Sequence, residues 1–162
     1  MSLLVRKINL AKWLQVDISQ TNDVKADAIT NCLKTFKNTL SVWKIDSEDD
    51  LEKAVLALVS NQDRFDTIDV VVLKESALTK YELNIIDSPG NTPVKSLVEA
   101  HKDIVELSFS GIGVIKDHIV ERILDQHTKR FTVGTLKKLV KKSIEEGLLN
   151  KDDLKESIRG KI

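Results

Sequence analysis

Apolar and polar positions along the chain predict a set of short strands. Leu3–Ile8 is a plausible opening strand with weak alternation, and Leu40–Ile45 alternates more clearly. Ile68–Leu73 is almost continuously apolar and β-branched, which is typical of a central strand covered on both faces. Tyr81–Ile86 and Val105–Phe109 alternate again. The pattern therefore predicts a small mixed sheet of about four or five strands.

Helical spacing of apolar residues appears between these strands. Ser47 is an expected N-cap for an amphipathic helix over 48–60. Pro93 opens a second predicted helix that runs to about Lys102, since proline at the first helical position loses no hydrogen bond. A short helical turn is also expected around Ala26–Leu33. These helices would pack on the sheet.

Three consecutive helices are expected after residue 110. Gly111-Ile-Gly113 breaks the preceding strand, and the helices then cover about 112–127, 133–146 and 151–159. The predicted fold is thus α/β or α+β, with a mixed body over 1–110 and a helical C-terminal segment over 111–162. No linker composition separates the two parts, so the boundary is soft and a single domain is equally compatible.

Composition narrows the class of protein. The 162 residues carry 25 Lys and Arg against 25 Asp and Glu, a formal net charge of zero, with 41% hydrophobic residues. Cys32 is the single cysteine, which excludes an internal disulfide framework and suits a reducing compartment. No apolar run is long enough to cross a membrane, and the N-terminus meets charge too early for a signal peptide. We therefore expect a cytoplasmic protein with no membrane partner.

Charge is unevenly distributed despite the zero total. The stretch 129–162 carries ten basic against five acidic residues. On the predicted helix 133–146, four lysines form a stripe opposite the apolar side, and two basic residues precede it. Such a stripe could neutralise phosphates, and this gives a candidate nucleic-acid interface: Lys129, Arg130, Lys137, Lys138, Lys141 and Lys142.

Two observations limit the nucleic-acid interpretation. The outer face of any amphipathic helix is polar, and lysine is a good helix former, so the stripe has a simple structural explanation. A helix-turn-helix built from 133–146 and 151–159 would place Asp152 and Asp153 against the DNA, which phosphate repels. Only a variant with the lysines of 133–146 facing the groove remains compatible.

Reaction chemistry finds little support in the sequence. The pair Gly111 and Gly113 lies where nucleotide-binding loops occur, but the third glycine of that fingerprint is replaced by Lys116. A tight turn explains the glycines more simply. The histidines lack metal-ligand spacing, and Cys32 is most simply a small buried hydrophobe. We predict no catalytic residues, no metal and no cofactor.

Trp13 is a candidate partner-binding residue, because tryptophan is enriched at binding hot spots, although core packing is the favoured interpretation. The leading functional hypothesis is a non-enzymatic intracellular protein-interaction or adaptor protein. Its C-terminal helices would provide the contact, with another protein or by self-association through 112–159. The alternatives are a nucleic-acid-binding protein that uses the basic face of helix 133–146, and a nucleotide- or metabolite-handling enzyme near Gly111–Gly113.

Overall fold

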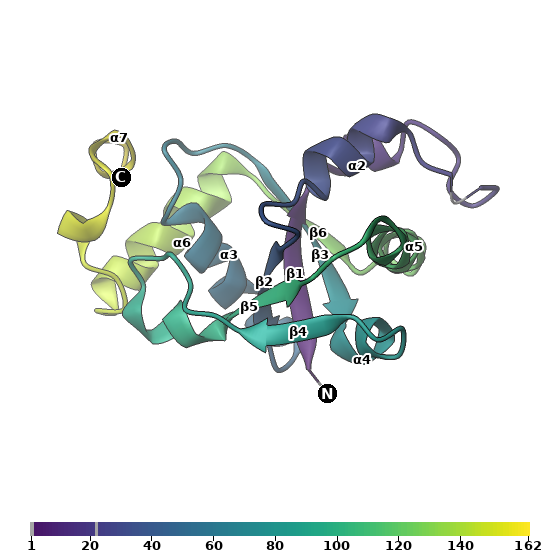
Figure 1. Cartoon of the computed structure of the whole chain (residues 1–162). Helices are drawn as coiled ribbons and strands as arrows, with labels where there is room; N and C mark the ends of the chain where they lie inside the picture. Colours follow the sequence, from purple (N-terminus) through teal and green to yellow (C-terminus); the bar gives the residue numbers. More distant parts are fainter. Residues whose placement is uncertain (1, 22) are drawn as a thin grey trace.

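A single open sheet forms the centre of the molecule (Figure 1). The computed structural model describes residues 2–21 and 23–162, and in these residues the sheet has six strands in the order β4-β5-β2-β1-β3-β6. Every neighbouring pair is antiparallel. The strands are β1 (Leu3–Ile8), β2 (Leu40–Ile45), β3 (Ile68–Lys74), β4 (Asn84–Asp87), β5 (His101–Val105) and β6 (Thr128–Phe131).

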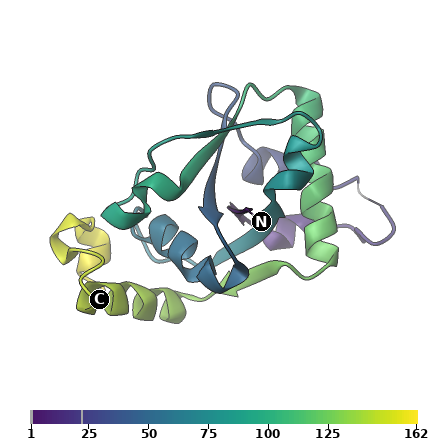
Figure 2. The same cartoon turned by 90° about the horizontal axis from the view of Figure 1, so that it is seen from below.

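Helices cover both faces of this sheet. One face packs against α3, α6 and α7, and the other against α1, α2, α4 and α5. Figures 1 and 2 show α5 and α6 on opposite sides of the strands. The helices and 3-10 turns are α1 (Leu10–Trp13), α2 (Ala26–Cys32), η1 (Glu48–Asp50), α3 (Leu51–Val59), α4 (Glu75–Thr79), η2 (Lys95–Ala100), α5 (Phe109–Leu124), α6 (Val133–Glu145), η3 (Lys151–Asp153) and α7 (Glu156–Arg159).

The central strand β3 is buried along nearly its whole length, as its apolar sequence predicts. Val70 and Val72 belong to the core under α3 and α6, whereas Val71 and Leu73 belong to the core under α5. Successive side chains of a strand point to opposite faces, so one apolar run supplies two cores. The predictions of α+β character and of strands at β1, β2 and β3 are confirmed.

The predicted composition of the sheet is partly wrong. The sheet has six strands in place of four or five, and it is wholly antiparallel in place of mixed. The unexpected strand is β6, which lies between two predicted helices. Its sequence, Thr128-Lys-Arg-Phe131, is short and charged, a common form for an edge strand because it discourages pairing with other chains. Its four residues are too few to show a clear alternation of apolar and polar positions.

The break predicted at Gly111-Ile-Gly113 is also wrong. Both glycines lie inside α5, which begins at Phe109. Ser108 caps this helix, because its Oγ accepts a hydrogen bond from the Gly111 N–H at 3.1 Å. The cap therefore moves the helix start ahead of the glycines, and no phosphate-binding loop forms between a strand and a helix here.

Three further elements differ from the prediction. The helix expected from Pro93 is the 3-10 turn η2, and β5 starts at His101, earlier than the strand predicted over Val105–Phe109. Pairing with β2 sets this start, since Trp43 lies opposite His101. The helix expected over 151–159 is divided into η3 and α7. A backbone ladder between remote segments overrides a weak local pattern.

The helix predicted over 133–146 is confirmed as α6. Thr132 caps it, with its side chain accepting from the Thr135 N–H, and Gly147 ends it with a φ of 74°. Ser47, the cap expected for the helix over 48–60, makes no side-chain cap hydrogen bond, and α3 begins through the 3-10 turn η1. Local capping signals thus locate both helix starts, but only one of them forms the expected bond.

The two parts predicted along the chain share the sheet. The strand β6 from the C-terminal part pairs with β3, and α5 packs on the same strand. The separation into 1–110 and 111–162 stays a prediction. Among the residues that the structure describes, no helix is long and apolar enough to cross a membrane.

Candidate anion-binding groove

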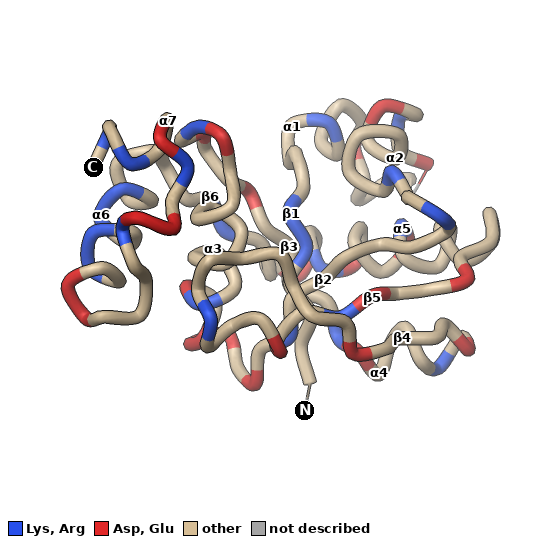
Figure 3. The backbone as a smooth tube through the Cα atoms, turned by 60° about the vertical axis from the view of Figure 1, so that its left-hand side comes forward, with Lys and Arg blue, Asp and Glu red and all other residues tan. Residues whose placement is uncertain are grey.

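A groove of about 880 Å³ lies at the edge of the sheet where β1 ends, β3 begins and β6 ends. Its other walls are the end of α2 and the loop between α3 and β3. Figure 3 shows the basic residues of β1 between these two walls. The lining residues are Arg6, Lys7, Ile8, Asn9, Asn31, Cys32, Leu58, Arg64, Thr67, Asp69 and Arg130.

Arg6 anchors the wall of this groove that faces α2. Its Nε and Nη2 donate to the carbonyl oxygen of Cys32 at 3.2 and 2.9 Å, and its Nη1 donates to the carbonyl of Ser41 at 2.7 Å. Burial lowers the pKa of Arg6 from its usual value, but an arginine side chain remains charged at neutral pH. The partners of this guanidinium are neutral carbonyls, so its positive charge is oriented without being neutralised.

Asp69 and Arg130 form the second charged feature of the groove. They lie directly opposite each other on β3 and β6. Arg130 Nε and Nη2 donate to Asp69 Oδ1 and Oδ2 at 2.7 and 3.0 Å, and the Leu10 N–H lies 3.4 Å from Oδ2. The hydrogen bond to Asp69 raises the pKa of Arg130. The bidentate geometry fixes the arginine in place.

The rim adds two exposed cations, Lys7 and Arg64. Arg64 pairs with Asp66, and its side chain remains 78% exposed. Within residues 2–21 and 23–162, neither Lys7 nor Arg6 forms an ion pair with a carboxylate. The lining residues thus comprise four cations against Asp69 alone. Because charges around a concave surface add, this groove attracts anions.

Neutral polar groups complete the wall. Asn9 and Asn31 line the groove beside Cys32, whose Sγ accepts a hydrogen bond from the Asn9 N–H at 3.2 Å. Amide side chains can donate and accept hydrogen bonds. Cys32 itself is buried, as expected for a small hydrophobe. None of the histidines is among the residues that line the groove.

The structure brings one of the six predicted nucleic-acid contacts into this groove, namely Arg130. Lys129 occupies the next position on β6 and lies over the Phe131 ring, on the opposite face of the sheet. Lys137 lies over the ring of Phe65. The remaining residues of the stripe are exposed on α6: Lys138, Lys141 and Lys142. This helix lies apart from β1 (Figure 3).

Trp13, the candidate partner anchor, is fully buried at 0% exposure in the core beneath α5. Its indole nitrogen has no hydrogen-bond partner among the described residues. The ring therefore contributes apolar burial to the fold and presents no surface in this conformation.

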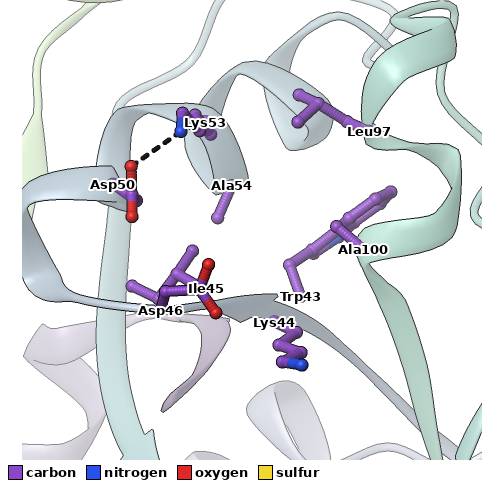
Figure 4. Close-up of a pocket in the computed structure, with 9 residues that line it drawn as sticks. All are labelled: Trp43, Lys44, Ile45, Asp46, Asp50, Lys53, Ala54, Leu97 and Ala100. Carbon is purple, nitrogen blue, oxygen red and sulfur yellow. Dashed lines mark ion pairs between the residues drawn. The ribbon is translucent and has the colours of Figure 1, made fainter. Parts of the chain in front are cut away.

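A second pocket, of about 230 Å³, lies on the other face between β2, α3 and η2 (Figure 4). Trp43, Ile45, Ala54 and Leu97 supply apolar side chains, while Lys44 points away from them. Lys53 is held by Asp50 at 2.7 Å. With two carboxylates, Asp46 and Asp50, against two lysines, and with a small volume, this pocket is less suited to an anionic ligand than the groove.

The sequence analysis missed Arg6, Lys7, Arg64 and Asp69 as members of a site. A signal for Asp69 existed, because a lone carboxylate interrupts the apolar run Ile68–Leu73 and lies in a central strand. Charged residues are rarely buried unless they are paired. No comparable signal marked Arg64, since it belongs to a polar loop.

Comparisons give no family assignment. No protein-family model, no curated protein and no solved structure matches this chain. Among the residues that the structure describes, no group of three or more His, Cys, Asp or Glu side chains is placed to hold a metal ion. The groove is therefore the feature of this chain that indicates a function.

Proposed function

We propose that this protein binds nucleic acid by its phosphate backbone, in the groove at the ends of β1, β3 and β6. The observation that carries the proposal is the uncompensated charge of Arg6, held by two backbone carbonyls and lining a groove with three further cations. Arg6 is half-buried. Partial burial of a cation without a counter-charge costs free energy, and a bound phosphate supplies that counter-charge.

The length of the concave surface supports a polymeric anion. Lys7 and Arg64 line both the groove and an adjoining recess of about 480 Å³. The two carboxylates of this recess are already paired, Asp63 with Lys155 and Asp66 with Arg64. The groove therefore continues past its own rim along the α3–β3 loop. A strand of nucleic acid places phosphates at regular intervals along such a path, whereas a single small anion would use only one part of it.

This proposal relocates the interface expected on helix 133–146. The apolar side of α6 packs inside the molecule, and Lys138, Lys141 and Lys142 on its other side are exposed. An isolated stripe on a helix is the ordinary polar exterior of an amphipathic element. The groove combines charge with concavity, and concavity strengthens the local field.

The protein-interaction function expected from the C-terminal helices stays a prediction. Many of the apolar residues on which it depended pack within the chain, among them Ile119, Leu136 and Val140. Less apolar surface is therefore left for self-association through 112–159. The alternative of an enzyme near Gly111–Gly113 depended on a nucleotide-binding loop at these glycines. It loses that support, because both glycines lie inside α5.

Fluorescence anisotropy with a labelled oligonucleotide over a range of salt concentrations tests the proposal. We expect log affinity to fall linearly with log salt concentration for the wild type. The double variant Lys7→Gln, Arg64→Gln is expected to bind more weakly, with a slope reduced by about one for each phosphate that is no longer neutralised. Both side chains are exposed, so the fold should persist.

The matched control is the double variant Lys138→Gln, Lys141→Gln, which removes the same charge from the exposed side of α6. We expect it to bind like the wild type. Salt-independent binding, or no binding at low salt, contradicts the proposal. If only the α6 variant loses affinity, the interface lies on that helix and the groove assignment is wrong.

A further inference from the structure

Two phenylalanines stand out on the surface for their exposure. Phe36 is 78% exposed and Phe109 is 95% exposed, the two highest values among the exposed large hydrophobic residues. Single exposed apolar residues are common, but aromatic rings are usually more buried than this. Their position relative to the groove connects them to the recognition of its ligand.

Backbone structure holds Phe36 outward at the base of a tight turn. Phe36 and Thr39 exchange two backbone hydrogen bonds, of 3.2 and 3.0 Å. Between them, Lys37 and Asn38 have φ values of 51° and 61°. Positive φ at both central residues is the signature of a type I′ hairpin turn, a rigid two-residue connection. The ring is thus presented by an ordered segment.

Phe109 is presented in a similarly fixed way. It is the first residue of α5, directly after the capping residue Ser108. The two aromatic segments are joined, because the Asn38 carbonyl accepts a hydrogen bond from the Leu107 N–H at 2.9 Å. Phe36 and Phe109 therefore lie on neighbouring segments that a hydrogen bond joins at the same end of the sheet.

This surface adjoins the groove through α2. The helix ends at Cys32, whose carbonyl holds Arg6, and Phe36 follows four residues later. Chain geometry limits the Cα separation of Cys32 and Phe36 to about 15 Å. Lys34 and Lys37 are exposed on this connection, against Glu106 on the neighbouring loop. Positive charge therefore extends from the groove towards the aromatic rings.

We infer that the ligand is single-stranded nucleic acid, with its phosphates in the groove and unpaired bases stacked on Phe36 and Phe109. This inference rests on the proposed nucleic-acid function. Single-strand binding sites combine a basic groove with exposed aromatic side chains, because every base has a π-face that an aromatic ring can cover. The paired bases of a duplex are already stacked on their neighbours, so these rings would select the single strand.

The test compares a labelled single-stranded oligonucleotide with its duplex, using wild type, Phe36→Ala, Phe36→Leu and Phe109→Ala. We expect the wild type to prefer the single strand. Each Ala variant should weaken single-strand binding about fivefold or more while the salt slope stays unchanged. Phe36→Leu should resemble Phe36→Ala, because leucine keeps an apolar side chain without the π-face. Phe36→Tyr, the matched control, should retain affinity.

A second readout is optical. In Phe36→Trp, the new exposed indole should show quenched fluorescence on addition of the single-stranded oligonucleotide, and little change with the duplex. The buried Trp13 and Trp43 provide a constant background that the wild type measures. Thermal melting of each variant checks the fold, which these exposed substitutions should leave intact.

The outcomes separate this inference from the proposed function. Salt-dependent binding that is equal for single strand and duplex, and unaffected by the Phe variants, overturns the stacking inference and leaves the groove proposal standing. Full affinity in Phe36→Leu also overturns stacking, and points to an apolar contact such as that of a protein partner. Absence of any salt-dependent binding overturns both.

Discussion

Asp69 and Arg130 lie side by side on β3 and β6, 61 residues apart in sequence, and form a bidentate ion pair at the mouth of the groove. The Asp69 side chain is 9% exposed, while the Arg130 side chain is 58% exposed. Asp69 therefore pairs with Arg130, a cation that would otherwise be available to an anionic ligand. The pair keeps the edge strand in register and limits the charge of the groove.

Replacing Asp69 with asparagine should release Arg130 for phosphate. We expect tighter oligonucleotide binding and a steeper salt dependence, with the slope increased by about one. Thermal stability should fall, because the hydrogen bonds to a buried carboxylate are weakened. Asp152→Asn, an exposed position on η3, serves as the control with the same charge change and should leave binding unchanged. Weaker binding by Asp69→Asn would contradict this assignment.

Arg6→Lys should destabilise the protein despite the conserved charge. The guanidinium holds Cys32 and Ser41 with three hydrogen bonds, and an ammonium on a single stem cannot reproduce this fork. We expect a loss of about 1–3 kcal/mol in the free energy of unfolding, measured by urea denaturation. Arg64→Lys, on the exposed loop, should change stability by less than about 0.5 kcal/mol. Equal effects of the two substitutions would refute the bridging role of Arg6.

Acidification should weaken the attachment of α5. His118 is buried, and its Nε2 accepts a hydrogen bond from the Lys74 backbone N–H at 3.0 Å. Only the neutral ring can accept this bond, because both ring nitrogens of a protonated histidine carry hydrogen. The other ring nitrogen, Nδ1, faces Glu121. Burial lowers the pKa of His118 below its usual 6.5, despite the opposing effect of Glu121. The unfolded chain therefore binds this proton more readily. The stabilising contribution is complete above about pH 6.5 and decreases as the pH falls through the folded pKa.

Urea denaturation at about pH 7.5 and pH 5 measures this effect. We expect the wild type to lose more stability between the two pH values than His118→Gln, which has no titrating ring. The difference between the two proteins isolates His118 from other titrating groups. An identical pH dependence in both would show that the histidine carries none of the effect.

Gly90→Ala should destabilise the turn over Trp43. A Cβ at this position would overlap the Trp43 ring and lie 2.7 Å from the His101 Cβ. Overpacking of this kind costs about 1–3 kcal/mol. Gly134→Ala is the matched substitution on α6, where a Cβ meets nothing within 4 Å, and it should stabilise the helix by about 0.5–1 kcal/mol. Thermal melting of both variants tests this prediction. A Gly90→Ala protein more stable than the wild type would contradict the close packing of Gly90 against Trp43 and His101.

Local patterns predicted the elements whose own residues define them. The apolar run of β3, the alternation of β2 and the caps of α6 each lie within a few consecutive residues. The elements that were missed depend on partners elsewhere. The strand β6 has four residues and is defined by its ladder with β3, while β5 starts where Trp43 lies opposite His101. The side-chain pattern of one segment does not reveal which strand will pair with it or in which register.

The candidate site was predicted in part, through Arg130. Arg130 directly precedes the basic stripe of the predicted helix 133–146, and the other five basic residues of that predicted interface do not line the groove. Arg6 was part of a predicted strand, and its basic side chain carried no sign of the carbonyls of Cys32 and Ser41 that orient it. A groove is a relation between segments, so a scan along one segment cannot find it.

The sequence by itself determined β2, β3 and α6 and which of their positions are apolar, because periodicity and capping act over a few neighbouring residues. The tertiary structure alone decided that Arg6, Asp69 and Arg130 share one face at one edge of the sheet. That juxtaposition depends on strand order and register, which arise from the packing of two cores on opposite faces of β3. Charges from distant segments meet where the ladder places them.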